Sequence, residues 1–511
     1  MKLHRRDIVK AGLGLGTGLA FAGRHSLKAQ TVDVAPTRFD DSTVRSLAQS
    51  LASKSYHAPQ RDLPDSLAHM TFDQFSSVQF NNEKTLWGQD HLAFDVQFFP
   101  RGYLYKQNVD IFEVTNGSAH PVTCTPDTFS SQDSSLNISS ETGFSGLRIR
   151  YALNRPGVME ECAVFLGASY FRAVAKGQVY GLSARGFAKD TGTPTGEEFP
   201  VFRAFWLEKP AAGSQSLVLH ALMDSPSLTG AFRFTIRPGE TTLFDVQSSF
   251  FPRVDITAGG IAPLTGMYYF DANDRVHVND WRPAAHDSEA LQIWTGASQN
   301  IYRPLTNPTD LQLSSFSDAG PYGYGLMQRK RSFHDYEDLA LHYEKRPSLW
   351  VEPVGNWGKG SVNLVEIPTP SEVNDNIVSF WRPQNPMKAG QSYNFTYRMY
   401  WGWDTPWPTH LARIHDTRAG AVTDHPDKVQ FVLDFDGEPF RTVSDPASYH
   451  LVAQTSVGTI GAITLMPNPE INGLRAFFQL DPGGAKLCEL QVQLANAQGP
   501  VSETWLYRWT P

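Results

Sequence analysis

The chain has 511 residues, of which 41% are hydrophobic and 12% aromatic, and its net charge is −8. A chain of this length is expected to contain at least two domains with substantial cores. Its acidic balance excludes nucleic acid and anionic lipid surfaces as natural partners, because their phosphates would repel it. A neutral substrate suits this charge better.

The first residues predict an export signal. Residues 1–29 combine Arg5 and Arg6 with a short apolar stretch and a small residue, Ala29, near a plausible cleavage point. This pattern is typical of a twin-arginine signal peptide, which is removed on maturation. The apolar stretch is shorter than the roughly 18 residues of a membrane span, and the rest of the sequence predicts no span. Cleavage removes six basic side chains and one acidic one, which changes the net charge from −8 to −13.

Two short helices are predicted before the strands begin. In residues 38–53, Val44, Leu47, Ala48 and Leu51 recur at helical spacing after Asp, Ser and Thr capping residues. Residues 63–78 predict a second short helix. Beyond about residue 90, short alternating or aromatic-rich runs are divided by Gly, Pro and Asn. Many short strands with regular turns predict an all-β fold, here a large antiparallel β-sandwich.

A second set of strands follows a change in composition. Residues 405–427 are rich in Pro, His and charge and have no apolar period, which predicts a linker. In the next run, Phe431, Leu433 and Phe435 alternate with more polar residues, and the remaining length fits one immunoglobulin-like sandwich. The predicted boundaries are 1–29 for the signal, 30–404 for the large domain, 405–427 for the linker and 428–511 for the immunoglobulin-like domain.

Cysteine usage implies neither a disulfide framework nor a metal. Three cysteines are too few for such a framework. Cys488 shares a strand face with Leu490, which predicts a core residue, and Cys124 and Cys162 lack Cys or His neighbours at metal spacing. No cofactor is predicted.

Tryptophan clusters in one part of the sequence. Eight of the twelve tryptophans lie between residues 281 and 407. For any single one, core packing is the commoner role. Sugar rings, however, stack on indoles, while their hydroxyls need charged and amide side chains around them. Residues 345–360 contain this mixture, and the sequence therefore favours a carbohydrate site.

Cleaving a glycosidic bond typically needs two carboxyl groups. Asp287, Glu352, Asp375 and Asp404 all lie near aromatic residues. A single aspartate in a loop is more often a turn or capping residue, and spacing does not select a pair.

Several sequence blocks together resemble a known family. These blocks include "FLGASYFRAV", "YGLSARG", "EEFPVFRAFW", "RPAAHDS", "KRPSLWVEP" and "VNDNIVSFW". They resemble the periplasmic glucan biosynthesis proteins of the G and D types, and the twin-arginine signal favours the D type. The resemblance implies a large galactose-mutarotase-like β-sandwich followed by an immunoglobulin-like domain. It also implies a glycoside hydrolase that acts on β-1,2-glucan with inversion.

The resemblance assigns roles to individual residues. Asp375, in the family's "DNI" block, corresponds to the general acid, and Asp287, in its "HDS" block, corresponds to the general base. The two are expected to face each other across a groove lined by residues 343–359. The predicted substrate-binding residues are Tyr343, Arg346, Trp350, Glu352, Trp357, Lys359 and His286.

The sequence leaves three hypotheses for the activity. The leading hypothesis is a periplasmic enzyme that trims or remodels a β-1,2-linked glucan, by hydrolysis or by transglycosylation to a cyclic product. A non-catalytic glucan-binding scaffold that presents chains to other glucan-synthesis proteins is the second. A mutarotase-like epimerase is the third, and the lack of a convincing pair of catalytic histidines counts against it. Monomer and homodimer both stay open.

The signal assignment predicts the effect of a conservative double change. Arg5→Lys combined with Arg6→Lys should abolish periplasmic accumulation, because the paired arginines are the signal. Fractionation of cells that express each form measures this effect. Unchanged accumulation of the double variant would contradict the assignment.

Overall fold

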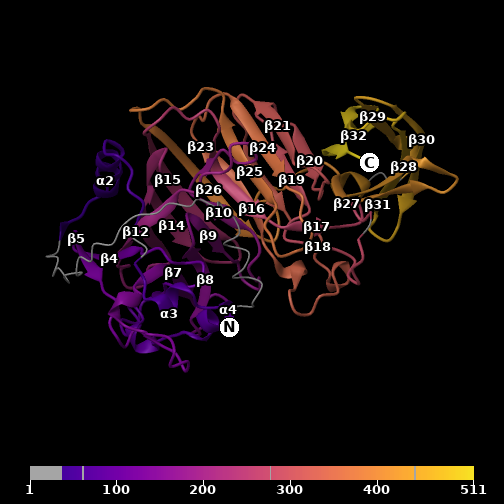
Figure 1. Ribbon diagram of the computed structural model, residues 1–511. Helices are drawn as coiled ribbons and strands as arrows, with labels where there is room; N and C mark the ends of the chain where they lie inside the picture. Colours follow the sequence, from indigo (N-terminus) through magenta and orange to yellow (C-terminus); the bar gives the residue numbers. More distant parts are fainter. Residues whose placement is uncertain (1–36, 60–61, 277, 442–444) are drawn as a thin grey trace.

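The computed structural model describes residues 37–511 apart from 60–61, 277 and 442–444 (Figure 1). The predicted signal, residues 1–29, lies outside the described residues. Within the described part of the chain, strands dominate, and no helix is long and apolar enough to cross a membrane. The helices are α2 (Thr43–Ala52), α3 (Asp65–Ala68) and α4 (Phe72–Ser77), with 3-10 turns η1 (Asn82–Lys84), η2 (Ser140–Thr142), η3 (Phe333–Asp335), η4 (Tyr343–Lys345), η5 (Glu438–Arg441) and η6 (Pro446–Ser448).

The predicted N-terminal helices are confirmed, with one difference. α2 buries Val44 and Ala48, as the helical spacing predicted, but Leu47 is 43% exposed. Residues 63–78 form two helices instead of one, because a new N-terminus begins inside this segment. There the Thr71 hydroxyl accepts from the Gln74 amide, and the Gln74 side chain accepts from the Thr71 amide, which is a capping box that starts α4.

Two large sheets contain most of the strands. In spatial order, the 16-stranded sheet consists of β1 (Thr37–Arg38), β5 (Ser118–Val122), β4 (Asp110–Thr115), β12 (Val201–Glu208), β13 (Leu217–Asp224), β14 (Leu228–Arg237), β15 (Thr242–Pro252), β26 (Tyr393–Gly402), β23 (Ser348–Val354), β22 (Gly323–Met327), β19 (Ala290–Trp294), β20 (Asn300–Pro304), β34 (Thr504–Trp509), β32 (Cys488–Asn496) and β29 (His450–Thr455), with β33 (Gly499–Pro500) beside β32. The 10-stranded sheet consists of β21 (Gln312–Asp318), β24 (Gly360–Glu366), β25 (Ile377–Pro383), β16 (Gly259–Gly266), β10 (Ser183–Arg185), β9 (Tyr170–Ala173), β8 (Glu160–Leu166), β7 (Phe144–Tyr151) and β3 (Phe94–Pro100), with β11 (Ala188–Lys189) beside β16.

Three smaller sheets complete the described structure. A four-stranded sheet consists of β27 (Arg413–Val422), β28 (His425–Asp436), β31 (Gly473–Asp481) and β30 (Thr459–Asn468), and two-stranded sheets pair β17 (Tyr268–Phe270) with β18 (Ala285–His286) and β2 (Gln79–Phe80) with β6 (Phe129–Ser130). The predicted all-β class is therefore confirmed. Most pairs are antiparallel, but β4 with β12 and β20 with β34 are parallel.

One core lies between the two large sheets. Phe165 on β8 of the smaller sheet meets Phe234 on β14 of the larger one, with ring centroids 5.3 Å apart. Trp381 on β25 is fully buried in the same core. Since these side chains come from facing sheets, burial of their aromatic surface holds the sheets together.

Strands β27 to β34, which we call the C-terminal unit, enclose a second core. Phe431 on β28 packs against Trp505 on β34 at a centroid distance of 5.7 Å, so the four-stranded sheet covers the end of the large sheet. Leu433 and Phe435 are also fully buried, as the alternation predicted. Cys488 lies in this core, which confirms its predicted packing role.

The segment predicted as a linker differs in the structure. Residues 413–422 form strand β27, which pairs with β28 along its length. The strand escaped prediction because polar contacts replace the usual apolar alternation: Asp416 is an ion-pair partner of Arg418, which also pairs with Asp434 at 2.7 Å. In Figure 1 the C-terminal unit lies beside β19 and β20.

The burial of Trp357 predicts a stability effect. Its side chain is 8% exposed and its indole N–H donates to the Thr396 carbonyl at 3.1 Å. Trp357→Ala should therefore lower the free energy of unfolding by about 3–5 kcal/mol, because it leaves a core cavity. Chemical denaturation measures this loss. Trp281, which is 70% exposed, is the matched control, and Trp281→Ala should change stability by no more than about 0.5 kcal/mol. Equal effects of the two changes would contradict a packing role for Trp357.

Candidate functional site

The C-terminal end of β16 brings the two predicted catalytic aspartates to one place. The Asn376 amide donates to the Gly266 carbonyl at 3.0 Å, and the Asp287 amide donates to the Met267 carbonyl at 2.7 Å. The Asp287 carboxylate in turn accepts from the Met267 amide at 3.3 Å. Gly266 at the end of β16 and Met267 between β16 and β17 thus anchor Asp287 and the residue that follows Asp375.

Gly266 has no room for a side chain. A Cβ atom at this position would lie 2.4 Å from Cδ2 of Leu182. Glycine therefore lets β10, β16 and the Asp287 segment approach closely, which is a common reason for glycine inside a strand.

Asn376 fixes the loop that contains Asp375. Its buried side chain accepts from the Tyr268 amide at 2.8 Å and donates to the Ile367 carbonyl at 3.0 Å. Asp375 precedes it and is half-buried, two residues before β25 begins. The 371–376 loop therefore has a defined position against β17 and the end of β24.

Arg185 provides the positive charge on the Asp375 side of the site. Its guanidinium donates to Thr265 Oγ1 at 2.7 Å and to Glu197 Oε1 at 2.5 Å, and it lies 4.9 Å from the centre of the Tyr170 ring. Burial raises the pKa of Tyr170 to about 12, and the negative charges of Glu197 and Asp375 add to this shift. Asp375 is thus part of a small electrostatic cluster formed by β9, β10 and the 371–376 loop.

Asp287 lies in a second, fully buried cluster. Arg346 donates to its carboxylate, and both side chains are almost completely removed from solvent. The same guanidinium covers the Tyr343 ring at 4.2 Å, and the Tyr343 hydroxyl donates to Glu372 at 2.8 Å. Burial raises the pKa of Tyr343, so its hydroxyl stays a donor. The arginine compensates the charge that Asp287 would otherwise bear alone in a dry environment.

Glu372 connects the two clusters, because it bonds to the Asp287 cluster and lies in the 371–376 loop with Asp375. It accepts from Tyr343 and also from Arg282 at 2.5 Å, and it lies in the same loop as Asp375. A shift of the Asp287 cluster would therefore move the loop that positions Asp375.

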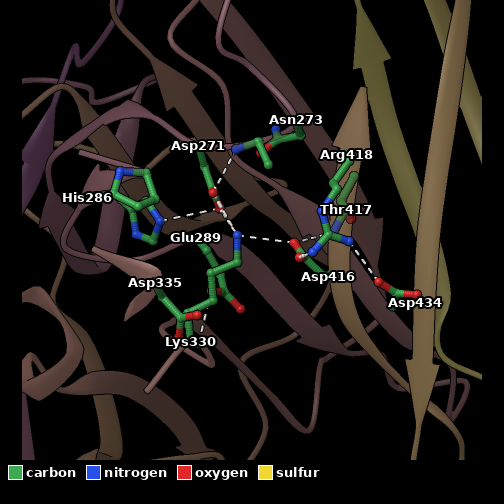
Figure 2. Close-up of polar contacts among 12 residues, drawn as sticks. Asp271, Asn273, His286, Glu289, Lys330, Asp335, Asp416, Thr417, Arg418 and Asp434 are labelled. Carbon is green, nitrogen blue, oxygen red and sulfur yellow. Dashed lines mark hydrogen bonds and ion pairs between the residues drawn. The ribbon is translucent and has the colours of Figure 1, made fainter. Parts of the chain in front are cut away.

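A third network starts at His286 and runs into the C-terminal unit (Figure 2). The His286 ring lies 3.0 Å from Gln328 Oε1 through Nδ1 and 3.4 Å from an Asp271 oxygen through Nε2. Lys330 Nζ is 2.6 Å from each Asp271 oxygen and 3.1 Å from Asp416 on β27. His286 is the residue before Asp287, so this network reaches the candidate site from the C-terminal unit.

Charge pairing outweighs burial at Asp271. Burial alone would raise the pKa of this carboxyl, but Lys330 and His286 lower it below its ordinary value. The pKa of Lys330 is raised, because its carboxylate neighbours outweigh the opposing effect of burial. Both groups therefore stay charged at neutral pH, and each depends on the other.

The remaining predicted binding residues lie along β23 and the turn that follows it. Trp350 is 1% exposed and packs edge-on against Trp407 with ring centroids 5.5 Å apart. Trp357 belongs to the main core. Glu352 is half-buried and accepts from the Tyr400 hydroxyl, and Lys359 is exposed. The structure brings His286, Asp287, Tyr343 and Arg346 together, but it places both tryptophans in packing contacts.

Several polar residues of these clusters were not predicted from the sequence. Arg185 and Glu197 occur in the blocks "YGLSARG" and "EEFPVFRAFW", yet nothing in their spacing indicated that they pair. Glu372 directly precedes the block "VNDNIVSFW", and nothing in the sequence indicated its contacts with Tyr343 and Arg282. Lys330 had no local signal at all, because its partners are 59 and 86 residues away in sequence.

Three side chains have ligand atoms close enough together to bind one metal ion. Ligand atoms of Asp41, Glu208 and His220 lie within 4.8 Å of one another. His220 Nε2 is already 2.6 Å from Glu208 Oε1, and the charge of Arg233 also acts on that glutamate. These contacts favour a hydrogen-bonded pair of His220 and Glu208 at this position over a metal.

Comparison with known proteins finds relatives along the whole chain. The family described as periplasmic glucan biosynthesis protein, MdoG, matches residues 39–509. A protein named glucans biosynthesis protein G from Bradyrhizobium diazoefficiens is 49% identical over 510 residues, which cover 100% of both chains. Proteins of the same name from Rhodopseudomonas palustris (strain CGA009) and Vibrio cholerae (strain O395) are 50% and 44% identical, over 93% and 92% of this chain and 94% and 87% of the relatives. These relatives are of the G type and do not support the predicted closeness to the D type.

Among solved structures, a heparan sulfate lyase HepC mutant from Pedobacter heparinus matches with a TM-score of 0.22 and 11% identity, over 57% of this chain and 38% of that one. This likeness is too low to carry an argument about the fold.

The Lys330 network predicts a large and pH-dependent loss of stability. Lys330→Met should lower the free energy of unfolding at neutral pH by about 3–5 kcal/mol, because Asp271 and Asp416 lose their shared cation inside the protein. In the unaltered protein, the lowered pKa of Asp271 stabilises the fold above the ordinary aspartate value and this stabilisation disappears on acidification. The penalty of Lys330→Met should therefore persist down to the ordinary aspartate value of 3.8 and shrink only below it. Denaturant unfolding at neutral pH, near this value and below it measures the change.

A matched control separates burial from loss of charge. Lys388 makes an ion pair with Asp255 at 2.7 Å, but both side chains are more than half exposed. Lys388→Met should cost no more than about 1 kcal/mol. A loss of similar size for the two variants would contradict the importance of the buried network.

Proposed function

We propose that this chain, which belongs to the periplasmic glucan biosynthesis protein MdoG family, cleaves or remodels a β-1,2-linked glucan backbone with inversion. The family match spans nearly the whole described chain. As a member of the family, it is a periplasmic protein of glucan biosynthesis. The reaction and its residues are the proposal.

One observation carries the proposal. Asp375 and Asp287 approach the end of β16 from segments that are far apart in sequence, and each has its own arginine nearby. Inverting glycosidases need two carboxyl groups with separate environments, one as acid and one as base. The half-burial of Asp375 and the complete burial of Asp287 supply two such environments.

Asp375 is the proposed general acid. It must donate a proton to the glycosidic oxygen, and its half-buried position lets a substrate reach it. Arg185 is already paired with Glu197, so its charge is largely compensated. A bound sugar that excludes water from Asp375 would then favour the protonated carboxyl group, which is the form an acid needs.

Asp287 is the proposed general base. The guanidinium of Arg346 favours its ionised form, and a base must be ionised to accept a proton. Because Asp287 is fully buried, the proton from the attacking water reaches it through a substrate hydroxyl and an ordered water in this proposal. The separation of the carboxyl groups is then at or beyond the roughly 6.5–9.5 Å of ordinary inverting enzymes.

The burial of Asp287 also favours the second candidate function. Its two carboxylate oxygens accept from Arg346 and from the Met267 amide, so both are engaged within the protein. A non-catalytic glucan-binding scaffold would need no accessible base. Transglycosylation to a cyclic glucan is a variant of the proposed reaction, in which a sugar hydroxyl replaces water as the attacking group.

Further assignments stay proposals. We keep the galactose-mutarotase-like and immunoglobulin-like descriptions of the two β-rich parts, with the first at 30–404. The predicted start of the second at 428 moves to 413, because β27 and the start of β28 belong to the C-terminal unit. Other glucan-synthesis proteins as partners, a homodimer and the twin-arginine signal in residues 1–29 are proposals of the same kind.

Two substitutions test the mechanism. Asp375→Asn should abolish turnover of linear β-1,2-glucan but retain binding, because the amide is nearly isosteric and cannot act as the acid. Asp287→Asn should also reduce turnover strongly, because no base remains to accept the proton. Chromatography of the products and calorimetric titration of the glucan measure the two properties.

Asp255→Asn is the matched control, because this aspartate is about half exposed and makes an ordinary surface ion pair. Its turnover should equal that of the unaltered protein. Full activity of Asp375→Asn would remove the proposed acid, and full activity of Asp287→Asn would remove the proposed base. Glucan binding without turnover by the unaltered protein would favour the scaffold.

A further inference from the structure

A cavity of about 380 Å³ lies where the 10-stranded sheet meets the C-terminal unit. The edge strand β21 forms one wall, and β34, β32 and β29 form the floor. Figure 1 shows β21, β20 and β32 in this region, at the junction with the yellow C-terminal strands. The volume is within the range of small-molecule sites, about 300–1,000 Å³.

The floor consists of two adjacent rows of polar side chains. Gln454 on β29 stands opposite Gln491 on β32, and Glu489 on β32 stands opposite Arg508 on β34. Neighbours across strands point to the same face, so these four side chains form one polar surface. The amides provide both donors and acceptors, as sugar hydroxyls require.

The charges at the cavity are already compensated. Arg508 Nε donates to Glu489 Oε1 at 2.6 Å, and its Nη1 donates to the Leu313 carbonyl at 3.2 Å. Arg303, which also lines the cavity, is buried and bonds to Glu366 at 3.0 Å. Both arginines at the cavity are therefore already paired with carboxylates, and the cavity offers no positive charge to attract an anionic ligand. A neutral polar ligand needs no such charge.

The β21 wall combines an apolar ring with a buried polar atom. Phe316 is half-buried and lines the cavity with Leu490 and Leu506. Ser314 is 7% exposed, and its Oγ has no hydrogen-bond partner among the described residues. A buried hydroxyl without a partner is costly, and a ligand hydroxyl in the cavity would satisfy it.

We infer that this cavity is a second, non-catalytic binding site for a glucosyl unit of a neutral glucan. The inference rests on the proposed function, because it takes the same glucan as ligand. Phe316 and Leu506 contact the C–H face of the sugar. Ser314, Gln454 and Gln491 bond to its hydroxyls. The site lies on β21, which β24 separates from β25 and Asp375, so it holds the glucan away from the reacting bond.

Hydrogen exchange locates the sugar in the full-length Asp375→Asn protein, which does not consume it. The probe is a short linear β-1,2-gluco-oligosaccharide. We expect slower exchange in residues 312–318 and 488–494 as well as in residues 371–383. Protection of residues 371–383 alone would overturn the second site and leave the proposed function intact. Protection of the first two segments alone would support the second site and overturn the proposed catalytic cleft. No protection in any segment would overturn both.

Two variants in the same background confirm which residues bind. Gln491→Ala removes an exposed amide and should abolish the sugar-dependent protection of residues 312–318, without loss of the protection at residues 371–383. Phe316→Ala should have the same effect. Val452→Ala is the matched control, because Val452 is exposed on the Gln454 face of β29 and does not line the cavity. Retained protection in Gln491→Ala and Phe316→Ala would overturn the assignment.

Discussion

The backbone groups at the end of β16 are the constraint on which the site depends. Gly266 and Met267 accept from the amides of Asn376 and Asp287, which are far apart in sequence. A buried backbone group without a hydrogen-bond partner destabilises the fold. Neither aspartate segment can therefore move away from the end of β16 without this loss of stability. Because Gly266 also leaves no space for a side chain against Leu182, the two aspartate segments meet at one fixed place.

Charge pairing then gives each of the two aspartates a different environment. A carboxylate as deeply buried as Asp287 persists only with a cation, and Arg346 provides it from the turn before β23. Asp375 is half-buried and shares the charge of Arg185 with Glu197. The same residue type therefore has two environments, and this difference, more than proximity, distinguishes an acid from a base.

Local patterns predicted the strands and the packing of the C-terminal core, because alternation directly reports which face is buried. Phe431, Leu433 and Cys488 are examples. The same kind of evidence was ambiguous for Trp350 and Trp357, since a tryptophan that stacks on a sugar and one that fills a core look alike in sequence. Their burial settles where they pack.

Long-range polar partners could not be predicted in this way. The sequence of strand β27 predicts a linker, because ion pairs made through Asp416 and Arg418 replace the apolar period of a strand. Lys330 likewise gave no signal, since its two carboxylates come from distant segments. Resemblance to a family predicted Asp375 and Asp287 as acid and base, and these roles stay predictions. The fold shows which charged residues surround them.

The C-terminal unit is joined to the large sheets by buried charge, which distinguishes it from an appended module. Adjacent residues at the end of β22 reach into it: Arg329 bonds to Glu503 at 2.7 Å, and Lys330 lies 3.1 Å from Asp416. Without the unit, Arg329 would lose its carboxylate partner and Lys330 one of its two. A change in the position of Lys330 would disturb Asp271, with which it pairs. Asp271 in turn contacts His286, the residue before Asp287. The parallel pairing of β20 with β34 adds a backbone connection at the same junction. The C-terminal unit is therefore part of the framework that positions the candidate base, although it contributes neither of the two aspartates.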